Sequence, residues 1–291
     1  MSALEQAVKA GKFVVTAEVG PPKGVNVEPM LEEAQFLSAW VDAVNVTDQQ
    51  SSVMTMGSLA ACRLLKDHGV EPVYQVTCRD RNRIALQSDL LSAGALGIEN
   101  VLCLTGDFIS LGDHPQAKPV FDLDSVTLLR AAHQLEEGHD LAGKDLKGAP
   151  HFFLGAVVSP GSNPVEPQIF KMQKKVRAGA QFFQTQAVYE PDKFARFMEH
   201  VRPLNVPVLA GIILLKSAGM ARFMNRNVAG VHVPDEFIEE MSSATDRVQQ
   251  SIEISARIIR EVKDTCQGVH IMALGWERHI PAVLQAAGLA G

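Results

Sequence analysis

Cysteine is scarce in this sequence, and its spacing argues against two kinds of structural site. The four cysteines, Cys62, Cys78, Cys103 and Cys266, lie far apart and form no CxxC or Cys/His pattern. A disulfide framework or a structural zinc site would need paired or closer spacing. The simplest interpretation is a protein of a reducing compartment, and we expect a cytoplasmic location.

Long apolar runs and clustered basic charge are also missing. No apolar stretch approaches the roughly 18 residues of a membrane span, and the first residues lack the basic start and apolar run of a signal peptide. The formal net charge is −6 at pH 7, and charged residues are spread along the chain. We therefore expect no membrane and no nucleic acid among the partners.

What the sequence does contain is a regular alternation of strand and helix patterns. With 291 residues and 46% hydrophobic content it can bury a sizeable core. Strand patterns fall at 13–18, 43–47, 72–77, 100–104, 152–158, 181–185, 206–213 and 268–274. Helical patterns fall at 27–39, 54–68, 84–93, 124–137, 165–178, 191–202, 219–226, 235–242, 244–266 and 280–287.

Eight strand patterns, each followed by at least one helix, predict an α/β fold in which residues 1–291 form a single (β/α)₈ TIM barrel domain. An open, doubly wound sheet is the alternative. Against it, Gly94-Ala95-Leu96-Gly97 precedes a strand, and no GxGxxG follows the first strand.

Two segments suggest roles beyond the barrel itself. The irregular loop at 108–121 is long for a compact domain, which favours a functional flap. The helical pattern at 244–266 is more apolar than one buried face needs. It could form a subunit contact in a homo- or hetero-oligomer, or it could lie against the barrel.

The strand ends carry the candidate chemistry, because the carboxyl ends of barrel strands share one rim. Glu18 ends the first strand directly before a Gly-Pro-Pro break. The other rim positions are 47–49, 77–78, 105–107, Ser159, 185–186 and 274–276. No histidine pair has metal spacing and no Ser-His-Asp set is apparent, so we expect no metal. The set suits a polar heterocycle held by hydrogen bonds and a single proton donor.

At these positions the chain resembles the methylenetetrahydrofolate reductases, flavin-dependent (β/α)₈ enzymes that reduce 5,10-methylenetetrahydrofolate to 5-methyltetrahydrofolate in one-carbon metabolism and methionine biosynthesis. The matching segments keep the family's order along most of the chain. They are Glu18-x-x-Pro21-Pro22, Val46-Thr47, Thr77-Cys78, Gly106-Asp107, Lys175-Val176-x-Ala178-Gly179-Ala180, Thr185-Gln186, and Gly211-Ile212 followed by a helix with Phe223.

The resemblance implies roles for individual residues. Glu18 matches the general acid that protonates the leaving nitrogen as the imidazolidine ring opens, and burial beside a flavin would favour its neutral form. Asp107 matches a catalytic carboxylate that also receives the pterin, and Gln186 and Phe223 match further substrate contacts. The implied flavin-binding residues are Thr47, Gln75, Thr77, Thr105, Gly106, Asp107, Ala156, Lys171 and Lys175.

Several departures from the family pattern cluster on the flavin. Gln75 stands where many members carry His, Thr105 where many carry Arg, and Gln168 where an Asp is common; the Tyr often found after the fifth strand is missing. We therefore predict that folate chemistry is retained while flavin binding is altered. FAD is the expected cofactor, with FMN or weaker FAD binding as alternatives, because an Arg can hold a diphosphate.

The source of the hydride is left open by the sequence. NADH or NADPH could reduce the flavin, or a small partner subunit could feed it electrons, as some members of the family work. Two other functions also stay open. The chain could be a folate-binding methyltransferase barrel without flavin, or a non-catalytic subunit that binds folate or flavin.

Overall fold

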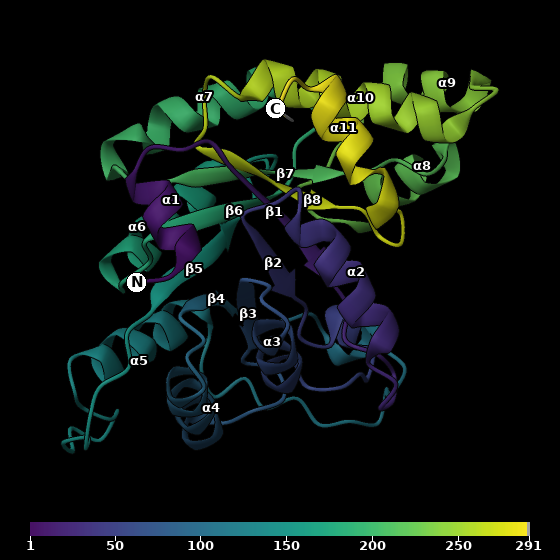
Figure 1. The fold of residues 1–291 in the computed structure, drawn as a ribbon. Coiled ribbons are helices and arrows are strands. Elements are labelled where there is room, and N and C mark those ends of the chain that lie inside the picture. The colour runs from purple at the N-terminus through teal and green to yellow at the C-terminus, as the bar shows by residue number, and fades with distance from the viewer. Residues whose placement is uncertain (290–291) are drawn as a thin grey trace.

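Eight parallel strands close into a barrel in the computed structural model, which describes residues 1–289 (Figure 1). Neighbouring strands pair in chain order, and β1 pairs with β8 to close the ring. The strands are β1 (Val14–Val19), β2 (Ala43–Val46), β3 (Pro72–Thr77), β4 (Asn100–Leu104), β5 (Phe153–Val158), β6 (Phe182–Ala187), β7 (Val208–Ile213) and β8 (Gly268–Met272). The predicted (β/α)₈ barrel is confirmed, and the open sheet is excluded.

Helices surround the barrel and connect its strands (Figure 1). The α-helices are α1 (Ala3–Lys9), α2 (Glu28–Ser38), α3 (Ser58–Asp67), α4 (Arg83–Ala95), α5 (Ser125–Glu136), α6 (Glu166–Arg177), α7 (Pro191–Val201), α8 (Ala218–Asn227), α9 (Asp235–Ser243), α10 (Arg247–Val262) and α11 (Ile280–Ala286). Short 3₁₀ turns are η1 (Gln50–Ser52), η2 (Ile109–Leu111), η3 (Arg202–Leu204) and η4 (Glu277–His279). Most boundaries lie within a few residues of the predicted ones.

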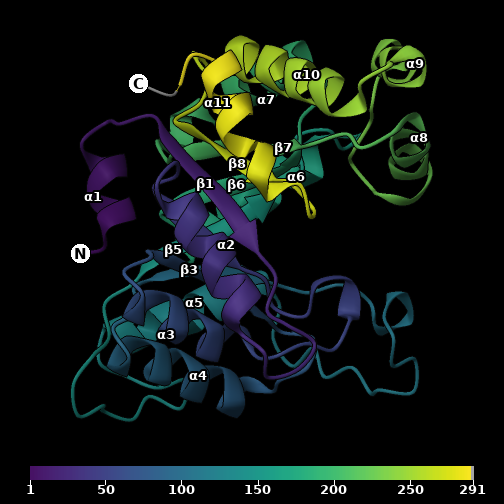
Figure 2. The same cartoon turned by 45° about the vertical axis from the view of Figure 1, so that its right-hand side comes forward.

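The sequence analysis missed α1, which lies where the barrel strands begin (Figure 2). Ser2 caps this helix by accepting a hydrogen bond from the backbone N–H of Glu5 at 3.0 Å. Leu4 is fully buried and packs with apolar side chains that enter the barrel from seven strands: Val14, Ala43, Val73, Leu102, Phe153, Phe182 and Leu209. The helix therefore closes the amino-terminal end of the barrel and leaves the carboxyl end as the place for a site.

The predicted helix at 244–266 is shorter than expected, because α10 spans Arg247–Val262. Its apolar residues Ile252, Ile254, Ile258 and Ile259 are all buried within the chain. Of the two interpretations left open by the sequence, packing against the barrel accounts for this apolar surface. Nothing in the helix then requires a subunit contact.

Residues 1–289 contain neither a membrane-spanning helix nor a metal-binding cluster. No helix in this range is long and apolar enough to span a membrane. No group of three or more His, Cys, Asp or Glu side chains in the same range is arranged to hold a metal ion. The four cysteines are free and buried.

Candidate active site at the carboxyl ends of the strands

Glu18 lies near the end of β1 with its side chain almost enclosed, and only 8% of the residue is exposed. One carboxylate oxygen, Oε2, lies 3.7 Å from Nε2 of His270 on the neighbouring strand β8. His270 is itself buried. A carboxyl group and an imidazole therefore face each other inside the barrel mouth.

A chain of hydrogen bonds across the barrel holds this histidine. Thr16 Oγ1 and His270 Nδ1 are 2.9 Å apart. Gln184 Nε2 donates to Thr16 Oγ1 at 3.2 Å and to Asn45 Oδ1 at 3.1 Å, and Asn45 Nδ2 donates back to Gln184 Oε1 at 2.8 Å. These side chains come from β1, β2, β6 and β8, and all are buried. They form a polar layer between the apolar plug below and Glu18 above.

The two ring nitrogens of His270 have different neighbours. Nδ1 bonds to Thr16 Oγ1, which also accepts a hydrogen bond from Gln184, while Nε2 faces the Glu18 carboxyl group. In the tautomer in which Thr16 donates to Nδ1, the imidazole proton is on Nε2, on the side of Glu18.

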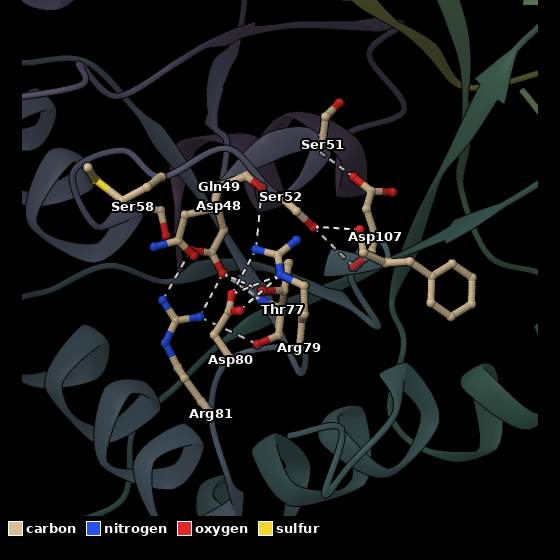
Figure 3. Close-up of polar contacts among 12 residues, drawn as sticks. Asp48, Gln49, Ser51, Ser52, Ser58, Thr77, Arg79, Asp80, Arg81 and Asp107 are labelled. Atoms are coloured by element: carbon tan, nitrogen blue, oxygen red, sulfur yellow. Dashed lines mark hydrogen bonds and ion pairs between the residues drawn. The ribbon is translucent and has the colours of Figure 1, made fainter. Parts of the chain in front are cut away.

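Asp107 follows β4 and is exposed on the rim (Figure 3). Its Oδ2 accepts a hydrogen bond from the backbone N–H of Ser51 at 3.0 Å. Ser52 Oγ donates to the backbone carbonyl oxygens of Asp107 at 3.3 Å and Phe108 at 3.0 Å. Within the described residues no protein donor contacts Oδ1, so this oxygen can receive a ligand.

A buried ion pair supports the rim between β2 and β3. Asp48 Oδ2 accepts hydrogen bonds from the backbone N–H and the hydroxyl of Thr77, at 2.8 and 2.9 Å. Arg81 donates from both terminal nitrogens to the same carboxylate, at 2.7 and 3.0 Å. Burial alone would lower the pKa of Arg81, but its bonds to Asp48 outweigh burial and raise it. Thr77 is therefore held in place by a fixed charge pair.

The residues predicted to hold a flavin fall into two groups. Thr47, Gln75 and Thr77 are buried on the adjacent strand ends of β2 and β3. Thr105 Oγ1, by contrast, accepts a hydrogen bond from the backbone N–H of Ser125 at 3.1 Å, at the start of α5. Gly106 has a φ of 96°, the left-handed region that favours glycine.

Lys175 does not point to solvent as a phosphate ligand would. It is buried, and its Nζ donates to the backbone carbonyl of Val157 at 2.6 Å. Burial, followed by the charge of Lys171, lowers the pKa of Lys175 to about 8. Ala156 has no exposed surface. Lys171 is exposed on α6, one turn of helix from Lys175.

This set of donors fits the ring of a flavin better than its phosphates. Buried hydroxyl and amide groups at the ends of β2 and β3 suit a flat ring with hydrogen-bonding edges. At the β4–β5 side, Thr105 and Lys175 each bond to a backbone group, and Lys171 is one of the exposed cations on α6. A phosphate or diphosphate group would be held weakly there.

The two remaining predicted residues lie on other sectors of the rim. Gln186 is half-buried near the end of β6. Phe223 lies on α8 with 60% of its surface exposed. The predicted residues that belong to strands or strand-end turns lie in the second half of their strands or directly after them, whereas Lys171, Lys175 and Phe223 lie on the helices α6 and α8.

Sequence reasoning missed His270 and Arg79, and it placed Asp48 on the rim, within 47–49, without giving it a role. His270 is a lone polar residue in the otherwise apolar strand β8, and it pairs in register with Thr16, another polar residue in an apolar strand. A polar residue at an inward position on each of two adjacent strands was the available signal. Asp48 and Arg79 sit in polar runs directly after strands, where a solvated interpretation is the natural one.

Comparisons with known proteins agree with this geometry. A family model described as methylenetetrahydrofolate reductase matches residues 3–288. "Methylenetetrahydrofolate reductase 2" of Schizosaccharomyces pombe is 25% identical over 80% of this chain and 38% of its own length. "Probable methylenetetrahydrofolate reductase (NADPH)" of Caenorhabditis elegans is 22% identical over 98% of this chain and 44% of its own length.

A solved structure from Clostridium thermocellum is similar over 98% of both chains, with a TM-score of 0.69 and 17% identity. It is described as an uncharacterized protein that binds two copies of 5-methyl-5,6,7,8-tetrahydrofolic acid. At this identity the likeness shows the fold alone. The chain spans less than half the length of the two curated relatives named above. On the strength of the family match, which covers nearly all of its residues, this chain belongs to the methylenetetrahydrofolate reductase family.

Proposed function

We propose that this chain reduces 5,10-methylenetetrahydrofolate to 5-methyltetrahydrofolate, with Glu18 as the proton donor. The observation that carries the proposal is the enclosed Glu18 at the rim, backed by the hydrogen-bonded chain of Thr16 and His270. Family membership supports the reaction. The folate bound by the structural neighbour is consistent with a pterin substrate.

The proton step follows from the position of Glu18. Opening the imidazolidine ring to an iminium cation leaves negative charge on the departing nitrogen unless a proton arrives. Glu18 supplies that proton, and the carboxylate that remains stabilises the adjacent cation. His270 Nε2 lies 3.7 Å from Oε2, and in the tautomer with its proton on Nε2 it would orient this carboxylate.

The pterin is held from the other side of the mouth. Asp107 presents Oδ1 as a free acceptor while Oδ2 is occupied by Ser51. The amino group and ring N–H of a pterin form a paired donor edge that suits a carboxylate. Gln186, near the end of β6, can both donate to and accept from the ring.

A flavin bound in the mouth would supply the hydride that reduces the iminium carbon. Thr47, Gln75 and Thr77 would hold its ring, and Lys171, an exposed cation on α6, would face its phosphates. The weak phosphate sector favours FMN, or FAD of modest affinity, over tightly bound FAD. Electrons would come from NADH, NADPH or a small partner subunit.

Colour and turnover test the proposal together. The purified chain should be yellow, or become so with FAD or FMN, and should form 5-methyltetrahydrofolate when its flavin is reduced under anaerobic conditions. A colourless chain that cannot be reconstituted and forms no product would contradict the proposal and favour a methyltransferase or a binding subunit. Rapid bleaching of the flavin by NADH or NADPH would exclude dependence on a partner subunit.

A further inference from the structure

The turn after β2 has an unusual backbone. Gln49, Ser51 and Ser52 have φ values of 44°, 55° and 60°, in the left-handed region that residues other than glycine rarely adopt. Such residues persist where surrounding contacts determine their conformation. This turn directs the Ser51 N–H at the Asp107 carboxylate and the Ser52 hydroxyl at the backbone beyond it (Figure 3).

Arg79 is the residue that holds this turn. It is 2% exposed, and its Nη2 donates to the backbone carbonyl of Gln49 at 3.3 Å. Its guanidinium also pairs with Asp80, from Nε at 3.0 Å and from Nη2 at 2.7 Å. With its amide nitrogen directed at the two carboxylates, the Gln49 side chain lies 3.2 Å from both Asp48 Oδ1 and Asp80 Oδ2.

The same arginine also contacts the segment that carries Asp107. A Cβ added to Gly106 would lie 3.0 Å from the Cβ of Arg79, so the turn after β4 rests on this side chain. The backbone carbonyl of Arg79 accepts a hydrogen bond from the N–H of Val120 at 2.8 Å, at the far end of the loop predicted to be a flap. Arg79 therefore touches both strand-end turns and the flap.

Burying a guanidinium is costly, and an apolar side chain with the same stem would fill this space more cheaply. Besides its pairing with Asp80, the guanidinium adds the bond to Gln49, which helps to hold the turn that donates to Asp107. We propose that Arg79 is a positioning residue for pterin recognition: it holds the Gln49–Ser52 turn so that Asp107 presents Oδ1 to the pterin. This inference rests on the proposed function.

A double-mutant cycle on the flavin-loaded chain tests it, with 5-methyltetrahydrofolate binding measured by calorimetry. Arg79→Met should weaken binding about tenfold, a typical loss for a misplaced charged acceptor. In the Asp107→Ala background the same change should cost no more than about twofold, because its effect passes through Asp107. The maximal turnover of Arg79→Met should stay within about twofold of the parent while KM rises, since the Glu18 network lies on other strands.

Two further variants serve as controls. Arg79→Lys keeps a donor near Gln49 and should recover binding to within about threefold of the parent. Arg63→Met removes a partly exposed arginine that pairs with Asp67 on α3, and should leave binding unchanged. Should Arg79→Met fail to fold, Arg79→Gln carries the same expectation.

Equal losses from Arg79→Met in both backgrounds would overturn the positioning role, and so would wild-type binding by Arg79→Met. If Asp107→Ala binds the folate as well as the parent, the pterin role of Asp107 is wrong, and this inference falls with it. The first two results leave the proposed function intact, whereas the third removes one of its parts.

Discussion

Two sectors of the barrel rim differ in how they use their polar side chains. Where β1 meets β8, Thr16 and His270 bond to each other and to groups from β2 and β6, and the chain of contacts ends at Glu18. Around β4 and β5, Thr105 and Lys175 bond to backbone groups at a helix start and a strand end. The polar groups of the first sector lead to the carboxyl group of Glu18, while those of the second bond to the backbone of the fold.

The difference between the two sectors indicates which polar side chains serve a function and which serve the fold. A polar layer in the middle of a barrel costs free energy unless every member is hydrogen-bonded, and an apolar layer would be cheaper. Its presence under Glu18 therefore favours a chemical role. Hydroxyl and ammonium groups that bond to the backbone need no chemical role to explain them. This agrees with the departures from the family pattern at Thr105 and at other positions expected to bind a flavin.

The largest effect in this comparison is expected from breaking the network under Glu18. Thr16→Val removes the hydroxyl that fixes His270, and His270→Asn removes the nitrogen that faces Glu18. Each should lower the maximal rate of folate reduction by roughly a hundredfold, the cost of misplacing a reacting group. Flavin binding should be unaffected. Thr16→Ser keeps the hydroxyl and should retain most of the rate, and equal rates for Thr16→Val and the parent would show that the network is structural.

The buried Lys175 in the second sector should make the stability of the chain depend on pH. The pKa of Lys175 is about 8 in the folded chain, below its ordinary value of 10.5, so the unfolded chain binds more protons between these values. Stability relative to Lys175→Met should therefore rise as the pH increases through this window. The expected gain between about pH 7 and about pH 10.5 is on the order of 3 kcal/mol, from denaturant unfolding.

Lys174→Met is the matched control for this pH dependence, because Lys174 is an exposed neighbour that lies over the Phe170 ring. It should show no comparable dependence relative to the parent. If the stabilities of Lys175→Met and the parent change with pH in parallel, the pKa of Lys175 is not lowered in the folded chain.

The smallest effect should come from Lys171. If it is the exposed cation that faces the flavin phosphate, Lys171→Gln should weaken FMN or FAD binding about threefold, as expected for a solvated ion pair. Lys174→Gln should leave flavin binding unchanged. A loss of a hundredfold or more from Lys171→Gln would show that the phosphate sector is built more strongly than its contacts suggest.

The fold could be predicted because its signals are local. Most of the buried strands are largely apolar runs followed by polar or glycine residues, and the eight repeats predict a barrel without long-range information. The short helix α1 was not predicted, because its seven residues are too few to show a helical repeat of apolar residues. Ser2 and Glu5 are nevertheless a recognisable helix start. Its role as a plug depends on side chains from seven distant strands.

The candidate site could be predicted only where a residue stands at a strand end. Glu18 and Asp107 meet that condition, and the structure places both on the rim. His270 lies inside a strand and Arg79 lies in a polar run after one, and the importance of both comes from contacts with residues 30 or more positions away. Pairing across a barrel and burial of a charged side chain are properties of the assembled fold, so the sequence pattern does not contain them directly.

The most direct test of the account is Glu18→Gln, which keeps the size of the side chain and removes its acidic proton. Binding of 5-methyltetrahydrofolate and reduction of the flavin by its donor should stay within a few-fold of the parent. Folate reduction should fall by at least about a hundredfold, the lower range for loss of a general acid. Glu28→Gln, at the start of α2, is the matched control and should be fully active. Near-normal folate reduction by Glu18→Gln would contradict the account, because another group would then supply the proton.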